Sequence, residues 1–316
     1  MSALALGAAA LGGEYGPIAP ETARATVRTA LDAGITLIDV SPYYGRTAAE
    51  TVLGDALRGV PRGSYRLASK VGRYDVDVFD FSADRVVRSV EESLRRLRTD
   101  HLDLIQCHDI EFGSLDQIVE ETLPALRGLQ EKGLVGAVGI TGFPLPALVS
   151  VARRAPVDTV LSYCHYTLQN RTLGERMPFI GERGIEVLNA SPLGMGLLTD
   201  SGPPGWHPAP AALREACGRA AEFCRQQGTS IVRLALQFAV TLPGVAATIV
   251  GAADPESVRR NAEWAAEPLD TGLLAAVDEI LADVRDEEWP VGRPENRVEA
   301  GPGTGPESWT GKQNAF

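Results

Sequence analysis

The chain has 316 residues, of which 44% are hydrophobic, and its formal net charge is -11 at pH 7. This length can bury a large core and fits one barrel of about 250 residues with insertions. We therefore expect a single catalytic domain over residues 1–316, with 285–316 as a C-terminal extension. The acidic balance argues against a nucleic-acid partner, because proteins that bind phosphate backbones present basic stripes.

The absence of targeting signals and the spacing of the cysteines predict a cytoplasmic protein. No apolar stretch approaches the length that spans a bilayer, and the opening MSALALGAAALGG lacks the basic start of a secretory signal. The four cysteines show neither C-x-x-C pairing nor zinc spacing. A metal-dependent barrel hydrolase is an alternative, but the four histidines form no H-x-H pair after the first strand. We expect no metal and no membrane partner.

Strand-like and helix-like segments alternate along the chain, which is typical of consecutive βα units. The expected strands are 4–7, 35–40, 65–70, 101–108, 135–140, 159–162, 185–191 and 246–251. The expected helices are 21–33, 48–58, a long helix that begins after Ser82, 115–131, 146–153, 173–183, 211–227, 231–242 and 255–265. Eight such units predict an α/β fold, a (β/α)8 TIM barrel, with a loop insertion at 192–207 and a C-terminal tail. In the tail, Trp289 could line a pocket or anchor the segment to the surface.

Four polar residues lie where an apolar run meets a turn: Asp39, Tyr44, Lys70 and His108. In barrels of this kind the chemistry lies at the carboxyl ends of the strands, where Asp39, Lys70 and His108 are expected. Tyr44 follows the second strand on a loop that can curl over the mouth. Taken singly, each residue could be a helix cap, a surface charge or a polar rim residue. Their order on successive strands favours a common catalytic role.

The physical chemistry of this set centres on the tyrosine. A phenol titrates near pH 10, which is too high for a good acid or base at neutral pH. An ammonium at Lys70 would favour the phenolate of Tyr44, and Asp39 would keep the lysine charged and in place. His108 would then orient the substrate oxygen through a hydrogen bond.

The strings DVSPYYG, ASK and CHD, which carry these four residues, resemble the aldo-keto reductase family over nearly the whole chain, to about Asn261. Longer strings, LIQCHDIEFGSLDQIVEETLPAL, VLSYCHYTL, ASPLGMGLL and GPPGWHPA, are similar to the sugar dehydrogenases of that family. These include plant L-galactose dehydrogenases and bacterial aldose 1-dehydrogenases that accept L-fucose. The resemblance implies an NAD(P)-dependent oxidoreductase.

The resemblance also implies a nicotinamide cofactor held without a Rossmann fold, and no G-x-G-x-x-G follows the first strand. Thr141 should face the carboxamide, although Gly142 stands where many relatives have asparagine. The segment 191–197 should wrap the pyrophosphate, with an ordinary turn as the alternative. The implied cofactor contacts are Gly7, Ala8, Thr141, Ser162, Ser191, Pro192, Leu193, Gly194, Gly196, Leu197, Gly251, Ala253, Ser257 and Asn261.

Two departures from the family pattern concern the nicotinamide. Ala190 stands where many members stack an aromatic ring on it, so the stacking must come from elsewhere or be weaker. The usual glutamine of the sixth strand has two competing positions, Ser162 and Tyr163.

The adenosine end of the site indicates NAD. NADPH-specific relatives place basic or hydroxyl side chains at Gly251, Ala252 and Ser257, and here these positions offer no positive charge for a 2′-phosphate. Asn261 should lie at the adenine. Arg259 and Arg260 leave NADP as an alternative, against their interpretation as helix-surface charges.

The implied reaction is oxidation of an aldose at carbon 1 to a lactone, with Tyr44 as the base. L-galactose, L-fucose and D-arabinose share the configuration of carbons 2 to 4, so one pocket could accept all three. The candidate substrate contacts are Tyr15, Tyr43, Asp109, His165 and Trp206, of which Tyr43, His165 and Trp206 could instead be loop packing. Asp109 and Glu111 suit hydrogen bonding to vicinal hydroxyls, although Glu111 could be solvated.

Two other functions fit the same residues. The chain could reduce small aldehydes or ketones with NADPH, in which case the tyrosine donates the proton. It could also be a cofactor-sensing subunit without turnover, which retention of all four proton-transfer residues disfavours. The expected partner is a small sugar, and no oligomeric state is predicted.

Overall fold

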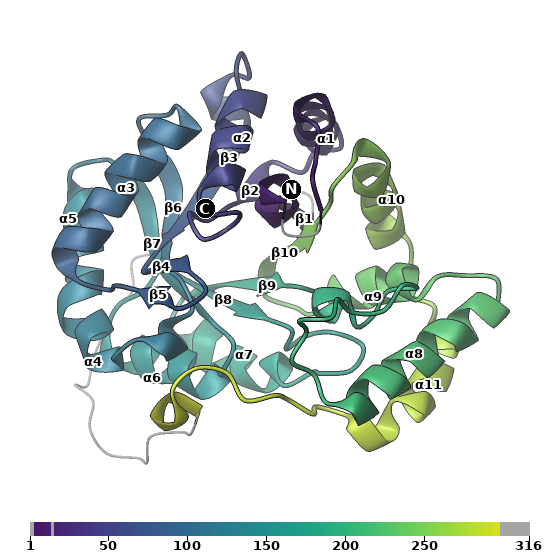
Figure 1. The fold of residues 1–316 in the computed structure, drawn as a ribbon. Helices are drawn as coiled ribbons and strands as arrows, with labels where there is room; N and C mark the ends of the chain where they lie inside the picture. Colours follow the sequence, from purple (N-terminus) through teal and green to yellow (C-terminus); the bar gives the residue numbers. More distant parts are fainter. Residues whose placement is uncertain (1–2, 14–15, 298–316) are drawn as a thin grey trace.

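Eight parallel strands close into a barrel in the computed structural model of the chain, which describes residues 3–13 and 16–297 (Figure 1). The strands follow the order β1-β10-β9-β8-β7-β6-β3-β2 around the barrel. Every neighbouring pair is parallel, which requires a crossover between the two strands of each pair. The predicted TIM barrel is confirmed.

Each barrel strand ends within two residues of its prediction. The strands are β1 (Leu4–Gly7), β2 (Leu37–Asp39), β3 (Arg66–Val71), β6 (Leu102–Cys107), β7 (Val135–Gly142), β8 (Thr159–Tyr163), β9 (Glu186–Ala190) and β10 (Val245–Gly251). Their sequences are short apolar runs rich in branched residues, as expected for strands buried on both faces.

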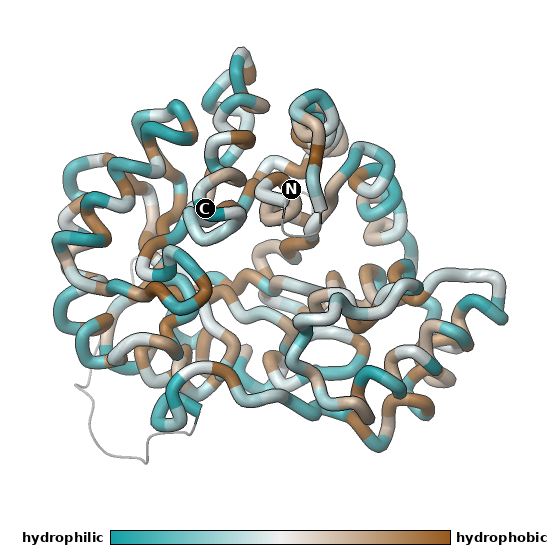
Figure 2. Tube along the Cα trace, in the orientation of Figure 1, coloured by the Kyte–Doolittle hydropathy of each residue, from teal (hydrophilic) through white to brown (hydrophobic). Residues whose placement is uncertain are grey.

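Helices surround the barrel and cover its outer face (Figure 1). They are α1 (Pro20–Asp32), α2 (Ala48–Ala56), α3 (Ala83–Leu97), α4 (Leu115–Gln117), α5 (Leu123–Glu131), α6 (Leu145–Arg154), α7 (Leu173–Glu182), α8 (Ala211–Gln226), α9 (Ile231–Ala239), α10 (Pro255–Ala266) and α11 (Thr271–Ile280). The hydropathy colours of Figure 2 show hydrophilic residues on the outer sides of these helices. No helix in the described part of the chain is both long and apolar enough to cross a membrane.

Three details differ from the prediction. The helix expected over 115–131 is interrupted by a π-helical turn, Ile118–Thr122, directly before α5. Pro124 lies in the first turn of α5 and lacks an N–H group, so the regular hydrogen-bond ladder cannot run through it. The prediction also missed α11, whose N-cap Asp270 accepts a hydrogen bond from Leu273 N at 2.9 Å.

The third difference is a short antiparallel hairpin, β4 (Arg73–Asp75) with β5 (Val78–Phe79), which follows β3 at the carboxyl end of the barrel. Its strands are too short and too polar to show a hydrophobic period. The hairpin matters because it places Arg73 only three residues after Lys70.

A cluster of apolar side chains inside the barrel shows which residues of each strand point inward. Because side chains alternate along a strand, every second residue faces the barrel axis. An interior cluster is formed by Ala5, Leu37, Ala68, Leu104, Ala137, Leu161, Leu188, Ala190, Ala247 and Ile249. By the same alternation, Asp39, Lys70 and His108 face inward, further toward the carboxyl ends of their strands.

A second core lies outside the barrel, where α8, α11 and the C-terminal segment pack together (Figure 1). Trp289 belongs to it with a relative exposure of 5%, and its ring centroid lies 4.9 Å from those of Phe143 and His207. Trp289 therefore anchors the C-terminal segment in a core rather than at the surface. Residues 298–316 of the predicted tail lie outside the described residues.

Candidate active site

Lys70 is the centre of the site. Its side chain, on β3, is 1% exposed, and its Nζ donates to Asp39 Oδ2 at 2.6 Å, to Val40 O at 3.0 Å and to Tyr44 Oη at 3.3 Å. An ammonium has three N–H donors, and these three acceptors use all of them. The predicted contact between the lysine and the tyrosine is therefore present.

Asp39 compensates the buried positive charge of Lys70. The residue is 3% exposed, and burial raises the pKa of its carboxyl while the Lys70 charge and hydrogen bond lower it. Removing either partner would leave an uncompensated charge in a low-dielectric site. The pair therefore fixes both the position and the charge of Lys70.

Tyr44 is held by an unusual loop after β2. Gly45, Arg46 and Thr47 have φ values of 57°, 48° and 76°, all in the left-handed region. A Cβ added at Gly45 would lie 2.1 Å from Gly12 O, so only glycine fits against the loop that follows β1. This close packing turns the chain back and places the phenol over the barrel.

His108, at the end of β6, lies beside this tyrosine, with ring centroids 5.6 Å apart. Its Nδ1 is 2.9 Å from Ser41 Oγ, which itself accepts a hydrogen bond from Tyr43 N at 3.1 Å. Since Ser41 already accepts there, its hydroxyl proton can be donated to Nδ1, which favours the tautomer with the proton on Nε2. Burial lowers the pKa of His108 to about 3, so the ring is neutral at physiological pH. Sequence reasoning did not single out Ser41, although it lies within the string DVSPYYG.

A second polar group lies next to His108. Asp109 has a left-handed backbone, with φ 52°, and its Oδ2 is 3.7 Å from His108 Nε2. The same carboxylate forms an ion pair with Arg73 of the β4–β5 hairpin. Sequence reasoning missed Arg73, because the hairpin that carries it has no periodic signal.

Glu111 is fully buried, so the alternative that it is solvated was wrong. Its Oε1 accepts hydrogen bonds from Phe143 N at 3.0 Å and from Tyr163 Oη at 3.3 Å. Burial, together with the nearby Asp109 carboxylate, raises the pKa of Glu111 to about 8. The C-terminal segment covers it, since Asn296 Nδ2 and Arg293 N each donate to its carbonyl oxygen at 2.9 Å.

The inward side of β7, β8 and β9 offers a surface that fits a flat nicotinamide ring. Thr141 lies at the end of β7, and its Oγ1 accepts from Asp109 N at 3.1 Å. Tyr163 and Ala190 are register partners on β8 and β9, and both belong to the inward set. The Tyr163 ring beside the small Ala190 side chain can supply the aromatic wall that Ala190 lacks.

The Ser162 side chain points away from the barrel axis, unlike that of Tyr163. Its hydroxyl is fully buried and lies 3.0 Å from His165 Nδ1, on the side of β8 opposite to Leu161 and Tyr163. The alternation of the strand therefore favours Tyr163 over Ser162 for the position of the family glutamine, and the predicted cofactor contact of Ser162 is not supported.

Other predicted cofactor residues gather at the carboxyl ends of neighbouring strands. Gly7 and Gly251 are register partners on β1 and β10, and the buried Ala8 follows Gly7. The segment 191–197 is a tight turn with left-handed residues at Ser191, Gly194, Met195 and Gly196, and it also contains Pro192, Leu193 and Leu197. The amides of Gly194, Gly196 and Leu197 donate to carbonyls of the same turn. The ordinary-turn interpretation thus accounts for these glycines locally, and their contact with a pyrophosphate stays a prediction.

The start of α10 carries the residues predicted at the adenosine. Asp254 caps this helix by accepting from Ser257 N at 2.8 Å, and the Ser257 hydroxyl donates to its second oxygen at 2.7 Å. These hydrogen bonds lower the pKa of Asp254 and keep it ionised. Ala253 is exposed beside it, and Asn261 is buried on the same helix. The structure thus adds a negative charge that sequence reasoning had not weighed.

The predicted substrate-binding residues fall into two groups, one beside His108 and one engaged in other contacts. The Tyr43 ring lies 5.8 Å from the His108 ring, next to Asp109. His165 is fully buried, with Nε2 3.1 Å from Glu288 Oε1, and Trp206 is 58% exposed and stacks on His207. The structure favours the loop-packing alternative for His165 and Trp206, because both are engaged away from Lys70. Tyr15 lies outside the described residues.

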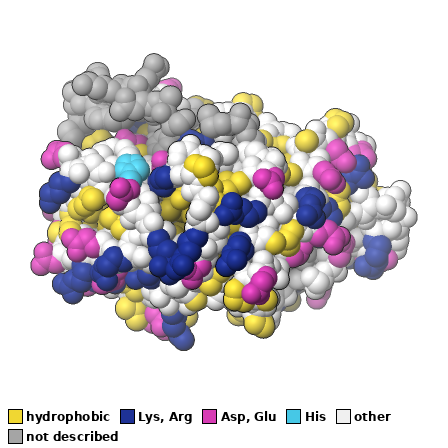
Figure 3. Space-filling view, turned by 90° about the horizontal axis from the view of Figure 1, so that it is seen from above, with side chains coloured by type: hydrophobic (Ala, Val, Ile, Leu, Met, Phe, Trp, Pro, Cys, Tyr) yellow, Lys and Arg dark blue, Asp and Glu magenta, His cyan; other side chains and the backbone are white. Residues whose placement is uncertain are grey.

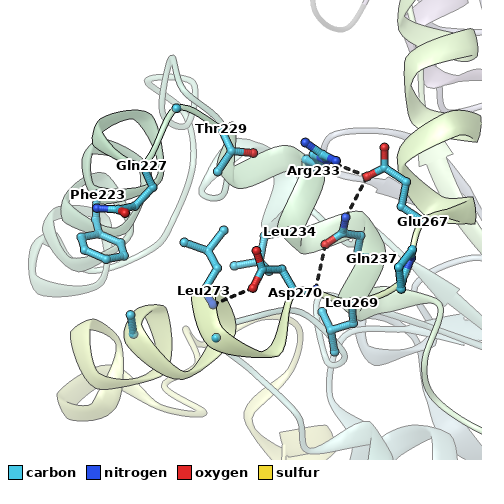
Figure 4. Close-up of a pocket in the computed structure, with 14 residues that line it drawn as sticks. Phe223, Gln227, Thr229, Arg233, Leu234, Gln237, Glu267, Leu269, Asp270 and Leu273 are labelled. Atoms are coloured by element: carbon cyan, nitrogen blue, oxygen red, sulfur yellow. Dashed lines mark hydrogen bonds and ion pairs between the residues drawn. The ribbon is translucent and has the colours of Figure 1, made fainter.

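A cavity of about 900 Å³ lies elsewhere, between α8, α9 and α11 (Figure 4). Its polar side chains bind one another: Glu267 accepts from Arg233 Nε at 2.6 Å and from Gln237 Nε2 at 2.9 Å. These side chains satisfy one another's hydrogen bonds, so they do not require a ligand as a partner. No His, Cys, Asp and Glu cluster that could hold a metal ion is found in the described residues, and the four cysteines are free and buried.

On the face shown in Figure 3, basic and acidic side chains lie among one another.

Comparison with known proteins agrees with the family resemblance seen in the sequence. The model of the aldo/keto reductase family matches residues 3–282. The chain is 44% identical to L-galactose dehydrogenase from Arabidopsis thaliana over 305 residues, which cover 94% of this chain and 95% of that protein. It is 35% identical to D-arabinose 1-dehydrogenase from Saccharomyces cerevisiae over 257 residues, covering 76% of each chain.

Among solved structures, the holo form of aldo-keto reductase AKR11C1 from Bacillus halodurans superposes with a TM-score of 0.73. The two chains are 25% identical, and the match covers 94% of this chain and 95% of the other. The barrel and the placement of its helices are therefore shared.

Proposed function

Because this chain belongs to the aldo/keto reductase family and is an NAD(P)-dependent oxidoreductase, we propose that it oxidises an aldose at carbon 1 to the lactone, with NAD as its cofactor. The observation that carries the proposal is the 3.3 Å contact between Lys70 Nζ and Tyr44 Oη, with Asp39 holding the lysine at 2.6 Å. Two relatives are named as dehydrogenases of L-galactose and D-arabinose, which supports an aldose as the substrate.

The chemistry follows from the neighbours of Tyr44. The Lys70 ammonium favours the phenolate, so Tyr44 can take the proton from the anomeric hydroxyl. The neutral His108 donates from Nε2 to the same oxygen and fixes its orientation. A bound nicotinamide supplies the acceptor for the hydride that leaves carbon 1. Asp39 keeps the ammonium in place throughout.

The residues that would hold the nicotinamide lie on the inward side of β7 to β9. Thr141 offers its hydroxyl to the carboxamide, and the Tyr163 ring offers a stacking surface beside Ala190. Thr141, Tyr163 and Ala190 lie at the carboxyl ends of β7, β8 and β9, which follow β6, the strand of His108, around the barrel. A nicotinamide held there would therefore lie at the same end of the barrel as His108.

We favour NAD over NADP on the charge at the start of α10. Gly251 and Ala252 bring no cation, and the ionised Asp254 would repel a 2′-phosphate. Of the two arginines that left NADP open, Arg260 lies 3.9 Å from Glu256 and over the Trp264 ring, at 5.4 Å from its centroid. Arg260 Nη2 also donates to Ser257 Oγ at 3.4 Å, so this arginine keeps NADP as the alternative that the cofactor assay decides.

The proposal extends to domain organisation and location. A single catalytic domain with residues 285–316 as its extension is supported by the hydrogen bonds of Asn296 and Arg293 to Glu111. A reducing, cytoplasmic setting is supported by the four free and buried thiols.

One assay tests the proposal. L-galactose, L-fucose, D-arabinose and D-glucose are each incubated with NAD and with NADP, and the absorbance of the reduced nicotinamide is followed. We expect turnover of the first three sugars with NAD. Cofactor binding without turnover would indicate the cofactor-sensing subunit, and reduction of small aldehydes with NADPH but no sugar oxidation would indicate the reductase.

A further inference from the structure

Arg73 lies at the barrel mouth in a position that packing alone does not explain. Its guanidinium carbon is 3.9 Å from the centroid of the Tyr43 ring and 5.4 Å from those of Phe79 and Phe112. The side chain is 15% exposed. An aromatic enclosure of this kind holds the planar guanidinium in one orientation.

The ion pair of Arg73 uses only part of its donor capacity. Its Nη1 contacts Asp109 Oδ2, while its Nε is buried and has no hydrogen-bond partner among the described residues. A guanidinium has five N–H donors, so donors remain for a ligand. Burying an ion pair also costs desolvation free energy, and an apolar pair beside the stacked rings of Phe79 and Phe112 would avoid that cost.

The same carboxylate lies within reach of the reacting centre. Asp109 Oδ2 is 3.7 Å from His108 Nε2, the atom expected to hold the reacting oxygen. A group on the carbon next to the reacting carbon would therefore lie near Asp109 and Arg73. The pair offers one acceptor and one donor side by side, which matches two neighbouring hydroxyl groups.

The local charge decides which class of group this subsite takes. Asp109 neutralises Arg73, and the neighbouring Glu111, whose pKa burial and the Asp109 carboxylate raise to about 8, adds no cation. A carboxylate or phosphate on the substrate would meet acidic groups without a free cation. Neutral hydroxyls can both donate to a carboxylate and accept from a guanidinium, so they fit better.

We infer that Arg73 and Asp109 form a subsite for the vicinal hydroxyls on carbons 2 and 3 of the sugar, and that Arg73 determines the specificity for polyhydroxylated substrates. The inference rests on the proposed aldose oxidation and adds a residue and a chemical requirement to it. Arg73 acts on substrate choice, whereas Tyr44 and Lys70 act on the proton.

The test compares each aldose with its 2-deoxy analogue in the wild type and in Arg73→Met. The wild type should favour the aldose by about 10- to 100-fold in kcat/KM, since an unpaired polar site rejects an analogue that lacks the hydroxyl. Arg73→Met should lose most of this preference, chiefly through KM for the aldose, and should keep its affinity for NAD in a fluorescence titration. Arg73→Lys, which keeps the charge but not the planar fork, should be intermediate and serves if the methionine variant does not fold.

Arg127→Met is the matched control. Arg127 Nη1 forms an ion pair with Asp158 Oδ2 at 2.6 Å, and its side chain is 25% exposed, but it lies on α5 and Asp158 precedes β8, at the opposite end of the strands from the subsite. This variant should keep the wild-type preference.

Three results would overturn the inference. The first is a wild type that oxidises the 2-deoxy analogue as well as the parent sugar. The second is an Arg73 variant that slows both substrates by the same factor. A wild type that oxidises no aldose at all would overturn the proposed function together with this inference.

Discussion

The phenolic oxygen of Tyr44 lies 3.3 Å from Nζ of Lys70, which also donates to Asp39 Oδ2 at 2.6 Å. The loop after β2 and the end of β3 supply the two residues, and they meet because β2 and β3 are neighbouring parallel strands of the barrel. By favouring the phenolate, the Lys70 ammonium would allow Tyr44 to act as the acid or base that we propose.

Replacing Tyr44 by Phe should lower kcat by at least about 1000-fold, because the proton acceptor is lost while the ring and its packing remain. The affinity for NAD, measured by quenching of tryptophan fluorescence, should stay within about threefold of the wild type. Tyr166→Phe is the control, because it removes a hydroxyl that lies 3.1 Å from Thr241 Oγ1, away from the site. A Tyr44→Phe enzyme with a near-native rate would refute the assignment.

His108 should remain neutral throughout the physiological range, because burial lowers its pKa to about 3. The ¹⁵N chemical shifts of its ring should show no protonation between pH 8 and pH 5. In the unfolded chain the imidazole binds a proton below about pH 6.5, so folding excludes that proton and stability falls as the pH drops through this range. Protonation of His108 near pH 6 in the folded protein would contradict the neutral state of the ring that burial implies.

Glu111 should give the opposite pH dependence of folding stability from His108. Its carboxyl should stay protonated in the folded state up to about pH 8, whereas in the unfolded chain it ionises near pH 4.5, the ordinary pKa of a glutamate. The folded state therefore binds the extra proton between these pH values, and stability should fall by about 1.4 kcal/mol per pH unit as the pH rises through that window.

The variant Glu111→Gln should remove this loss, so its melting temperature relative to the wild type should rise from pH 5 to pH 8. Glu120→Gln, at an exposed position on the same segment, is the control and should follow the wild type. Parallel melting curves of wild type and Glu111→Gln across the range would show that Glu111 is ionised in the fold.

The cofactor preference can be shifted at Asp254. Asp254→Ser keeps a side-chain oxygen for the helix cap but removes the charge that would repel a 2′-phosphate. The ratio of kcat/KM for NADP to that for NAD should rise by about 5- to 10-fold. Asp270→Ser makes the same replacement at the N-cap of α11 and should leave the ratio unchanged. An unchanged ratio in Asp254→Ser would place the 2′-hydroxyl elsewhere.

The loop that carries Tyr44 should be intolerant of a side chain at Gly45. Gly45→Ala combines a φ of 57° with a Cβ only 2.1 Å from Gly12 O, so the loop must move. We expect a loss of at least about 2 kcal/mol in the free energy of unfolding, and a fall in kcat. Gly59→Ala has the same backbone strain (φ 73°) in open space and should cost only about 1 kcal/mol. Equal losses in chemical denaturation would show that the contact with Gly12 is unimportant.

The residue order along the chain was enough to predict the barrel and to bring the four candidate catalytic residues to one end of it. Its apolar runs mark eight strands, because strands buried on both faces must be apolar along their length. Once the strands are assigned, the rule that chemistry lies at their carboxyl ends brings Asp39, Lys70 and His108 together. The positions of these residues follow from order along the chain and need no knowledge of side-chain direction.

Only the tertiary structure decided which side chains surround that set. Tyr163 rather than Ser162 faces inward because a strand alternates its faces, and a shift of one residue reverses the answer. Arg73 reaches Asp109 through a hairpin too short to leave a sequence pattern. Glu111 and Trp289 are buried by segments distant in the chain, as in the contact of Asn296 with Glu111. The burial and pairing of these side chains depend on contacts between residues far apart in the sequence, so local sequence patterns do not predict them.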